Sequence, residues 1–486
     1  MLFNSLEFAL FFPCVTALYF LLPHRARWML LLLASCFFYM AFVPAYILIL
    51  LFTIAVDYCA GIWIENARGT ARKWLLALSL AANIGVLAVF KYYGFLASNA
   101  EGLLGFLGIK THWPALNIIL PIGLSFHTFQ AMSYTIEVYR GNQKAERHFG
   151  IYALYVMFYP QLVAGPIERP QNLLHQFREE HSFDPARATR GIKLMAQGLF
   201  KKVVIADQLS VAVNLVFDDP ARQTGTSSLL AILYFAFQIY FDFSGYSDIA
   251  LGSAEVMGFK LMKNFDTPYF SASIGEFWRR WHISLSTWFR DYLYVPLGGS
   301  RVSLPRRCLN VMIVFLVSGL WHGANWTYVV WGSMHGGMIV LENLFGGSKQ
   351  SASHNPLRPA AQSVWWALGV VRTFTLVSIA WVFFRARSFS DAWTLLANAW
   401  SGIVSLPHWW LSGRMWSDLR SGSMALNLML IGSAVLLEAL DRRKNLWQRL
   451  GGWPVLPRYA AYYAVIYVTL LTGLGHTETQ FIYFQF

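Results

Sequence analysis

The chain has 486 residues, of which 56% are hydrophobic and only 13% are charged. Soluble domains contain roughly 45–50% apolar and about 25% charged residues, so a soluble protein of this length would lack the charge to cover its surface. Apolar stretches close to the ~20 residues that cross a bilayer recur along the chain. The composition therefore predicts an all-α polytopic membrane protein, and it excludes a secreted domain, a cytosolic enzyme and a fibrous protein.

The formal net charge is +13, from 38 Lys and Arg against 25 Asp and Glu. In a soluble protein this excess would point to nucleic acid, but in a membrane protein cations gather in cytoplasmic loops and set the orientation. We therefore expect membrane lipid, and no nucleic acid, as a partner. No two cysteines form a Cys-x-x-Cys pair, which argues against a disulfide framework or a zinc site. They are Cys14, Cys36, Cys59 and Cys308.

The first third of the chain predicts crossings separated by basic loops. The apolar segment 6–22 has no basic residues before it and no cleavage site after it, so we expect a retained helix rather than a signal peptide. His24, Arg25 and Arg27 follow directly, which places this loop in the cytoplasm and the N-terminus outside. Further crossings are predicted over residues 28–64 (two short ones, broken near Pro44), 74–95 and 115–138, with an outside loop over 98–114.

The middle of the chain is less regular. A short apolar piece, residues 152–164, precedes a polar segment that is predicted to be re-entrant or interfacial on the cytoplasmic side. Crossings are predicted outward over 191–217 and back over 229–252. Ser273 and Glu276 form a capping-box pattern ahead of a helix that is apolar almost all round, which suggests partial burial at the inner interface.

The last part of the chain predicts a hairpin and three crossings. Residues 309–341 are apolar apart from a polar break over 318–325, and basic residues on both sides of this stretch predict two short arms with the break deep in the protein. Irregular backbone at that depth is tolerated only where it is buried or lines a cavity. Crossings then follow over 365–384, 426–440 and 459–475, which places the tail 476–486 on the outer side.

His322 is the first catalytic candidate. It lies in an apolar region, directly after Trp321 and close to Asn325. A neutral imidazole can accept a hydroxyl proton near pH 7, and burial favours the neutral form. The alternative is a histidine that is hydrogen-bonded and serves only packing.

His282 is the second candidate. Trp278, His282 and Ser286 follow one another at a spacing of four residues, which places them on one face of a single helix. Arg279 and Arg280 could meet the phosphates of a nucleotide-bearing donor. The alternative is a basic interface that faces lipid headgroups.

Three further residues each allow two interpretations of their role. Asp242 and Asp248 could line a polar tunnel, or they could serve capping and hydrogen bonding between helices. Tyr483 could anchor the chain at the membrane interface, or its hydroxyl could hold an acyl group covalently. The histidines show no spacing typical of metal ligands, so no metal site is expected.

Six stretches together resemble the membrane-bound O-acyltransferases, and in particular their bacterial alginate O-acetyltransferase branch. Each stretch alone is a weak signal, whereas the set covers nearly the whole chain. They are residues 120–126, 158–166, 241–248, 277–286, 320–323 and 381–386.

The resemblance implies a fold, two active-site histidines and an acyl relay. It implies a ring of about 11–13 transmembrane or re-entrant helices around a thin centre with a cytoplasmic funnel, in one domain over residues 1–486 (motif-rich core about 115–345). His322 matches the family's essential histidine and His282 its second active-site histidine. The tail, 476–486, is similar to the acyl-carrying motif of the teichoic acid D-alanylation system, which makes Tyr483 a candidate acyl relay.

We therefore expect an O-acetyltransferase of the bacterial inner membrane, with both termini in the periplasm. Acetyl-CoA or another acetyl thioester would serve as donor substrate, with no bound cofactor. A periplasmic acetyltransferase or adaptor, together with a polysaccharide-synthesis complex, would pass the acetyl group to an exopolysaccharide such as alginate. Peptidoglycan O-acetylation, a transporter or flippase without catalysis, and a scaffold subunit remain alternatives.

Overall fold

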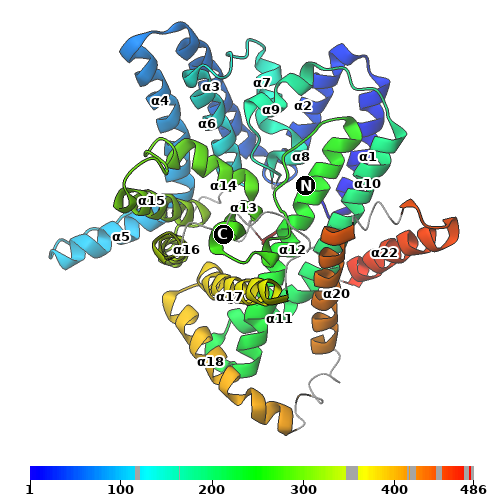
Figure 1. Ribbon diagram of the computed structural model, residues 1–486. Coiled ribbons are helices and arrows are strands. Elements are labelled where there is room, and N and C mark those ends of the chain that lie inside the picture. Colours follow the sequence, from blue (N-terminus) through cyan, green and yellow to red (C-terminus); the bar gives the residue numbers. More distant parts are fainter. Residues whose placement is uncertain are drawn as a thin grey trace.

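The computed structural model describes residues 1–114, 121–163, 165–345, 360–412, 415, 423–444, 451–475 and 481–482. Within these ranges the chain is helical and contains no strand. The short helices α13 and α14 lie near the centre, and the longer helices surround them (Figure 1). The expected all-α architecture is confirmed, while the cytoplasmic funnel stays a prediction.

Six stretches in the described part of the chain are long and apolar enough to cross a membrane. They are Pro44–Asn66, Gly69–Phe106, Gly225–Met257, Leu304–His322, Ser363–Arg385 and Ser423–Arg442. A seventh apolar helix, α1 (Leu6–Leu21), is shorter. Together with the apolar composition, these helices make the chain a multi-pass membrane protein.

The N-terminal helices begin and end mostly where the sequence predicts. The break near Pro44 is confirmed, because a 3₁₀ turn at Pro44–Tyr46 separates α2 (His24–Met40) from α3 (Ile47–Asn66). The predicted crossing 74–95 and its outside loop are wrong in their bounds. Helix α4 (Gly69–Leu87) continues through a π-helical turn, Ala88–Tyr92, into α5, whose bounds are Tyr93–Phe106.

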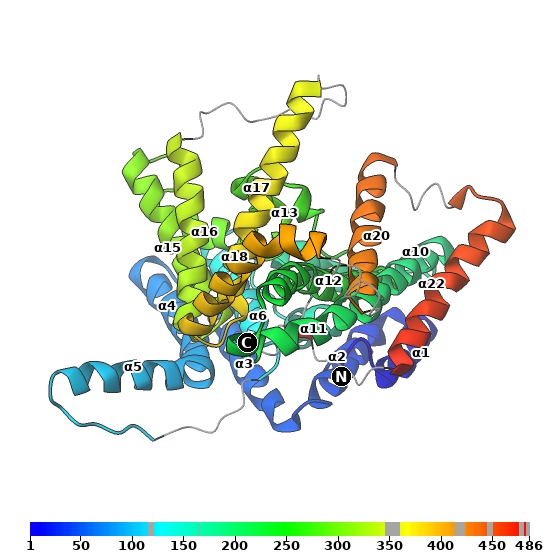
Figure 2. The same cartoon turned by 90° about the horizontal axis from the view of Figure 1, so that it is seen from below.

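Helix α5 extends away from the body of the molecule (Figure 2). Residues 98–106 belong to α5, so low charge alone is a poor basis for assigning a loop there. Of the crossing predicted over 115–138, residues 115–120 lie outside the described part, and α6 begins after a left-handed Gly123 and spans Leu124–Arg140.

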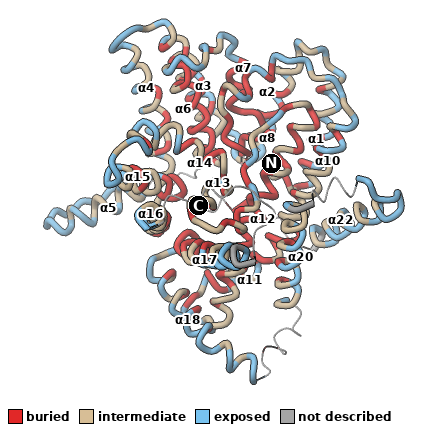
Figure 3. The backbone as a smooth tube through the Cα atoms, viewed as in Figure 1, coloured by how far each residue is buried: buried red, intermediate tan, exposed pale blue. Residues whose placement is uncertain are grey.

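The centre of the molecule is built from short, fully buried elements and one long helix. Buried residues gather along α6, α7 (Phe149–Met157), α8 (Tyr159–Leu162) and α12, whereas α4, α20 and α22 are largely exposed (Figure 3). Exposed apolar side chains on the peripheral helices are those expected to meet lipid rather than water.

Helix α12 (Gly225–Met257) packs along α10 (Pro185–Leu199), and the two backbones approach closely at pairs of glycines. A Cβ on Gly198 would lie 2.5 Å from the carbonyl oxygen of Gly245. Small residues at helix contacts permit this close packing in membranes. Between α10 and α11 (Asp207–Phe217) the chain forms a π-helical stretch, Phe200–Ala206.

The remaining helices include the α15–α16 hairpin and the two short central helices. The predicted hairpin with a polar break is confirmed: α15 and α16 pack against each other and are separated by residues 323–325. The described helices of this part are α9 (Pro170–Leu173), α13 (Ile274–Arg280), α14 (Ile283–Phe289), α15 (Leu304–His322), α16 (Trp326–Phe345), α17 (Ala360–Arg385), α18 (Phe389–Leu411), α20 (Ser423–Lys444) and α22 (Val455–Gly475).

Candidate active site

His322 is the last residue of α15 and lies in an aromatic cage. Its side chain is 5% exposed, and its ring centroid lies 4.8 Å from that of Trp321, 5.0 Å from that of Trp331 and 5.2 Å from that of Phe384. The cage is built from α15, α16 and α17. It separates the imidazole from bulk water, so a proton taken up here would have to come from a bound reactant.

His282 lies between two short helices rather than within one. It has φ +43° and ψ +56°, a left-handed conformation that is uncommon outside glycine, and it is fully buried. Helix α13 ends at Arg280 and α14 begins at Ile283. The sequence-based assignment of Trp278, His282 and Ser286 to one helix face is therefore wrong.

Asn264 holds the backbone on the C-terminal side of this kink. Its carbonyl accepts the Ile283 N–H at 2.9 Å, and its side-chain oxygen accepts the Ser284 hydroxyl at 2.7 Å. Its amide nitrogen donates to Ser247 on α12 at 3.0 Å. Buried, fully bonded networks of this kind can hold a strained residue in place. No sequence pattern points to Asn264, because its role depends on contacts between distant segments.

Trp321 connects the two histidines. Its ring centroid lies 4.8 Å from that of His322 and 6.4 Å from that of His282. Phe126 on α6 contacts both Trp321, at 5.5 Å, and His282, at 6.0 Å. The tertiary structure thus brings together two histidines that are 40 positions apart in the chain, with a shared aromatic wall between them.

A third buried histidine lies beside this centre. His335 on α16 is fully buried and accepts a hydrogen bond at Nδ1 from Trp278 Nε1, at 3.2 Å. It contacts Trp331, which also contacts His322. Trp278 is therefore a partner of His335, a residue whose spacing from His322 matches no sequence motif.

The other candidates of the 278–286 segment lie apart from the imidazoles. Arg279 is exposed, Arg280 pairs with Glu276 at 2.8 Å, and the Ser286 hydroxyl donates to the Trp281 carbonyl at 3.1 Å. The predicted capping box is present in modified form. Ser273 accepts the Glu276 N–H, whereas the Glu276 carboxylate accepts the N–H of Ala272.

Asn325 caps the hairpin turn. Its side-chain oxygen accepts the Thr327 N–H at 3.0 Å, and its amide nitrogen donates to the Arg387 carbonyl at 3.2 Å. These contacts stabilise the start of α16 and fasten it to the segment after α17. The described contacts thus give Asn325 a role in shaping the loop that follows His322.

Asp242 and Asp248 form ion pairs between helices. Asp242 pairs with Lys202 at 2.6 Å, and Asp248 pairs with Lys201 at 2.7 Å. Lys202 also pairs with Asp207 at 2.7 Å. Buried ions in membrane helices are expected to pair in this way. Of the two sequence-based readings, the described contacts support the link between helices.

Two described tail residues, Phe481 and Ile482, lie in the core. The Ile482 N–H donates to Asp242 Oδ2 at 2.7 Å, and the Phe481 ring lies 4.4 Å from that of Tyr246. Phe481 also contacts Phe243, whose centroid is 4.6 Å from that of His282. Tyr483 itself lies outside the described residues.

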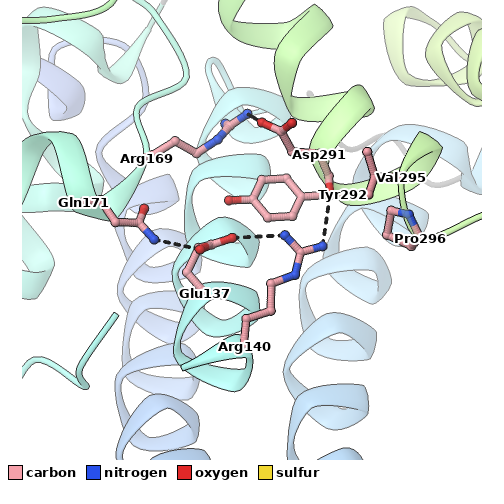
Figure 4. A pocket seen from close by; sticks show the side chains of 8 residues that line it. All are labelled: Glu137, Arg140, Arg169, Gln171, Asp291, Tyr292, Val295 and Pro296. Carbon is pink, nitrogen blue, oxygen red and sulfur yellow. Dashed lines mark hydrogen bonds and ion pairs between the residues drawn. The ribbon is translucent and has the colours of Figure 1, made fainter. Parts of the chain in front are cut away.

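A cavity of about 570 Å³ is lined by residues of α6, of the segment around the start of α9 and of the stretch 291–296 (Figure 4). The guanidinium carbons of Arg140 and Arg169 lie 5.0 and 4.9 Å from the ring centroid of Tyr292. Among the described residues, the terminal nitrogens of Arg169 have no hydrogen-bond partner, and the Asp291 carboxylate lies 3.7 Å away. The cavity is lined by Glu137, Arg140, Arg169, Gln171, Asp291, Tyr292, Val295 and Pro296.

A continuous row of rings leads from this cavity to His322. Tyr292 lies 5.1 Å from Trp288, Trp288 stacks on Phe129 at 3.8 Å, and Phe129 stacks on Trp321 at 5.1 Å. Trp321 is the immediate neighbour of His322. The cavity and the histidines are therefore parts of one packed unit.

Carboxylates near the cavity are held in a low-dielectric environment. Glu168, directly before Arg169, is fully buried, and this burial raises the pKa of its carboxyl to about 7. Its carboxylate accepts the Met262 N–H. In the described part of the chain, no group of three or more His, Cys, Asp and Glu side chains could hold a metal ion.

Comparison with known proteins identifies the family of the chain. Residues 148–358 match the family model of the membrane-bound O-acyltransferases. The chain is 40% identical over 417 residues to a protein of Pseudomonas aeruginosa named probable alginate O-acetylase AlgI, covering 85% of this chain and 76% of that protein. A protein of the same name from Azotobacter vinelandii is 38% identical over 459 residues, covering 93% and 87%.

A peptidoglycan O-acetyltransferase of Helicobacter pylori is 35% identical over 442 residues, covering 84% of this chain and 80% of that protein. These similarities extend over most of each chain, and the family match contains His282 and His322. The chain therefore belongs to the membrane-bound O-acyltransferase family and is an O-acyltransferase.

Proposed function

We propose that this protein transfers acetyl groups from a cytoplasmic thioester, such as acetyl-CoA, across the bacterial inner membrane for O-acetylation of an exopolysaccharide. The observation that carries the proposal is the buried pair His282 and His322, which share the Trp321 ring. A buried imidazole in an aromatic cage suits proton transfer to and from a bound reactant.

In the proposed reaction, His322 takes the proton from the acceptor hydroxyl as the oxygen attacks the thioester carbonyl. A C–O bond forms, the C–S bond breaks, and the thiolate receives the proton that His322 carries. His282 positions the donor or polarises its carbonyl. Burial of both imidazoles (0% and 5% exposed) keeps water from competing with the acceptor.

The Tyr483 hydroxyl is the proposed first acceptor. The neighbouring Ile482 is bound to Asp242, and Phe481 contacts Phe243 beside His282. A tail held so close to His282 suits an acyl relay. A periplasmic acetyltransferase or adaptor would then accept the acetyl group, which requires the C-terminus to face the periplasm; an N-terminus on the same side is part of this proposal.

The donor is proposed to enter from the cytoplasmic side. Arg140 and Arg169, on either side of Tyr292, offer guanidinium groups to the phosphates of a nucleotide-bearing thioester. Arg279 and Arg280 are an alternative phosphate site, although Arg280 is already paired with Glu276. The row of rings from Tyr292 to Trp321 joins the first of these sites to His322.

The names of the relatives suggest which polymer is acetylated. Two of them are named for alginate, which favours an alginate-like exopolysaccharide and a partner complex that synthesises it. One relative is named for peptidoglycan, which is the second candidate substrate. An acyl relay in the tail is compatible with both polymers, because a partner would carry the acetyl group from the tail to either of them.

The test is His322→Ala, with His112→Ala as control, since His112 is almost fully exposed on a loop. We expect His322→Ala to insert into the membrane normally and to abolish both thiol release from the donor and O-acetyl signals in NMR spectra of the polymer. His112→Ala should retain both. Normal acetylation by His322→Ala, or acetylated polymer without thiol release, would contradict the proposal.

A further inference from the structure

The C-terminal end of α15 lacks the usual cap from the residues that directly follow it. A helix leaves its last four carbonyls without helical partners, and a left-handed glycine commonly closes the end. Here the next residue, Gly323, has φ −161°, which is extended backbone. Only the Gly319 carbonyl is met locally, by the Gly323 N–H at 3.3 Å.

The three remaining carbonyls are bound by two consecutive residues of another helix. Tyr92 donates its hydroxyl to the Leu320 carbonyl at 2.8 Å. The Lys91 ammonium donates to the Trp321 carbonyl at 2.7 Å and to the His322 carbonyl at 3.0 Å. Every orphan carbonyl of the last turn is thereby satisfied, and a cation lies at the negative end of the helix dipole.

Lys91 and Tyr92 are brought to this position by the π-helical turn Ala88–Tyr92, which interrupts the helical run Gly69–Phe106. Such turns insert an extra residue and are frequent at functional sites. The Lys91 ammonium also approaches the Ser125 hydroxyl, at 3.4 Å, and the Trp321 ring, at 5.9 Å from its centroid. The turn therefore links α4–α5, the start of α6 and the end of α15.

We propose that Lys91 and Tyr92 are positioning residues for His322: they clamp the last turn of α15 from outside and hold the His322 backbone in the place that acyl transfer requires. This role rests on the proposed function of His322. Without the clamp the last turn would fray, as helix ends without capping partners do. Because a misplacement of about 1 Å can cost roughly 100-fold in rate, a fixed turn matters for the chemistry.

The experiment combines two measurements on the purified full-length protein. The variants are Lys91→Met, which keeps the length of the side chain, Lys91→Arg, which keeps donors, and Tyr92→Phe. Tyr93→Phe is the matched control, because Tyr93 donates to the Pro114 carbonyl at 2.9 Å, away from α15. Lys73→Met, at an exposed position of α4, is the second control.

Hydrogen–deuterium exchange measures how firmly the last turn of α15 is held, independently of enzymatic activity. We expect faster exchange of the amides of residues 319–323 in Lys91→Met and Tyr92→Phe, with unchanged exchange in the N-terminal half of α15 and in both controls. Lys91→Arg should restore much of the protection. Unchanged exchange at 319–323 in both Lys91→Met and Tyr92→Phe would overturn the clamp.

Acetyl-transfer kinetics test whether the clamp positions His322 for the reaction. We expect kcat to fall roughly tenfold or more in Lys91→Met, with the donor KM unchanged and partial rescue in Lys91→Arg. Faster exchange together with normal kcat would overturn the positioning role. Should His322→Ala itself retain full activity, the proposed function would fail, whereas the exchange data would still decide whether the clamp exists.

Discussion

The carboxylate of Asp242, in the middle of α12, accepts the backbone N–H of Ile482, 240 positions further along the chain, at 2.7 Å. The same carboxylate pairs with Lys202. One buried acid thus joins a π-helical stretch, a central helix and the C-terminal segment. It holds Ile482, whose neighbour Phe481 contacts Phe243 beside His282.

Replacing Asp242 should release the tail. In Asp242→Ala the Ile482 N–H loses its acceptor, and Lys202 loses one of its two described carboxylate partners, so the tail is held less firmly. We expect faster deuterium uptake in peptides that contain residues 481–482, together with reduced acetyl transfer. In Asp248→Ala, which breaks only the pair with Lys201, tail exchange should stay as in the wild type. Equal tail exchange in all three proteins would contradict the anchor.

Two substitutions at His282 distinguish the role of its imidazole from the role of its left-handed backbone. Asparagine tolerates this conformation better than alanine does. We expect both His282→Asn and His282→Ala to lose acetyl transfer. His282→Asn should be the more stable of the two by on the order of 1 kcal/mol, and should therefore melt at the higher temperature. Thermal unfolding in detergent and donor turnover check the two parts. Retained turnover in His282→Asn would show that the imidazole is dispensable.

Arg169 should govern donor affinity rather than the chemical step. Arg169 lines the cavity, and its buried terminal nitrogens have no hydrogen-bond partner among the described residues, so a donor phosphate would gain charge-assisted bonds there. We expect Arg169→Gln to raise the donor KM roughly tenfold with little change in kcat. The control is Arg178→Gln, an exposed partner of Glu146. A larger rise of KM in Arg279→Gln than in Arg169→Gln would favour the alternative phosphate site.

The α15–α16 hairpin depends on glycines at its closest approach. A Cβ on Gly332 would lie 2.3 Å from the Phe315 carbonyl oxygen, whereas one on Gly337 would meet nothing within 4 Å. We expect Gly332→Ala to lower stability by about 1–3 kcal/mol and to disturb the His322 cage. Gly337→Ala, on the same helix, should be neutral or slightly stabilising. Thermal unfolding checks both, and equal melting temperatures would refute the packing argument.

Glu168 should make stability depend on pH. Burial raises the pKa of its carboxyl to about 7 from an ordinary value of 4.5, so the folded state binds this proton more tightly than the unfolded state. Its stabilising contribution is therefore complete below about pH 4.5 and is lost as the pH rises through about 7. We expect Glu168→Gln to melt at a less pH-dependent temperature between about pH 5 and about pH 8.5. Parallel melting curves for the two proteins would contradict this assignment.

The central contacts follow less directly from the sequence than the peripheral helices do. Hydropathy predicts the break near Pro44 and the hairpin around His322, because lipid demands apolar length and tolerates irregular backbone only inside the protein. Local patterns also predict the cap at Ser273. They fail at His282, where a helical spacing conceals a left-handed kink that Asn264 supports from a distant loop.

By itself, the sequence determined the class of protein, most of the outer helices and the two histidines worth testing, since composition, periodicity and short motifs are local properties. Only the tertiary structure decided that Trp321 lies between His282 and His322, and that Asp242 binds Lys202 and the tail. It alone showed that Lys91 and Tyr92 close the end of α15. Each of these contacts joins residues far apart in the chain, and packing and hydrogen bonding in a buried, low-dielectric centre select them in ways that no local pattern records.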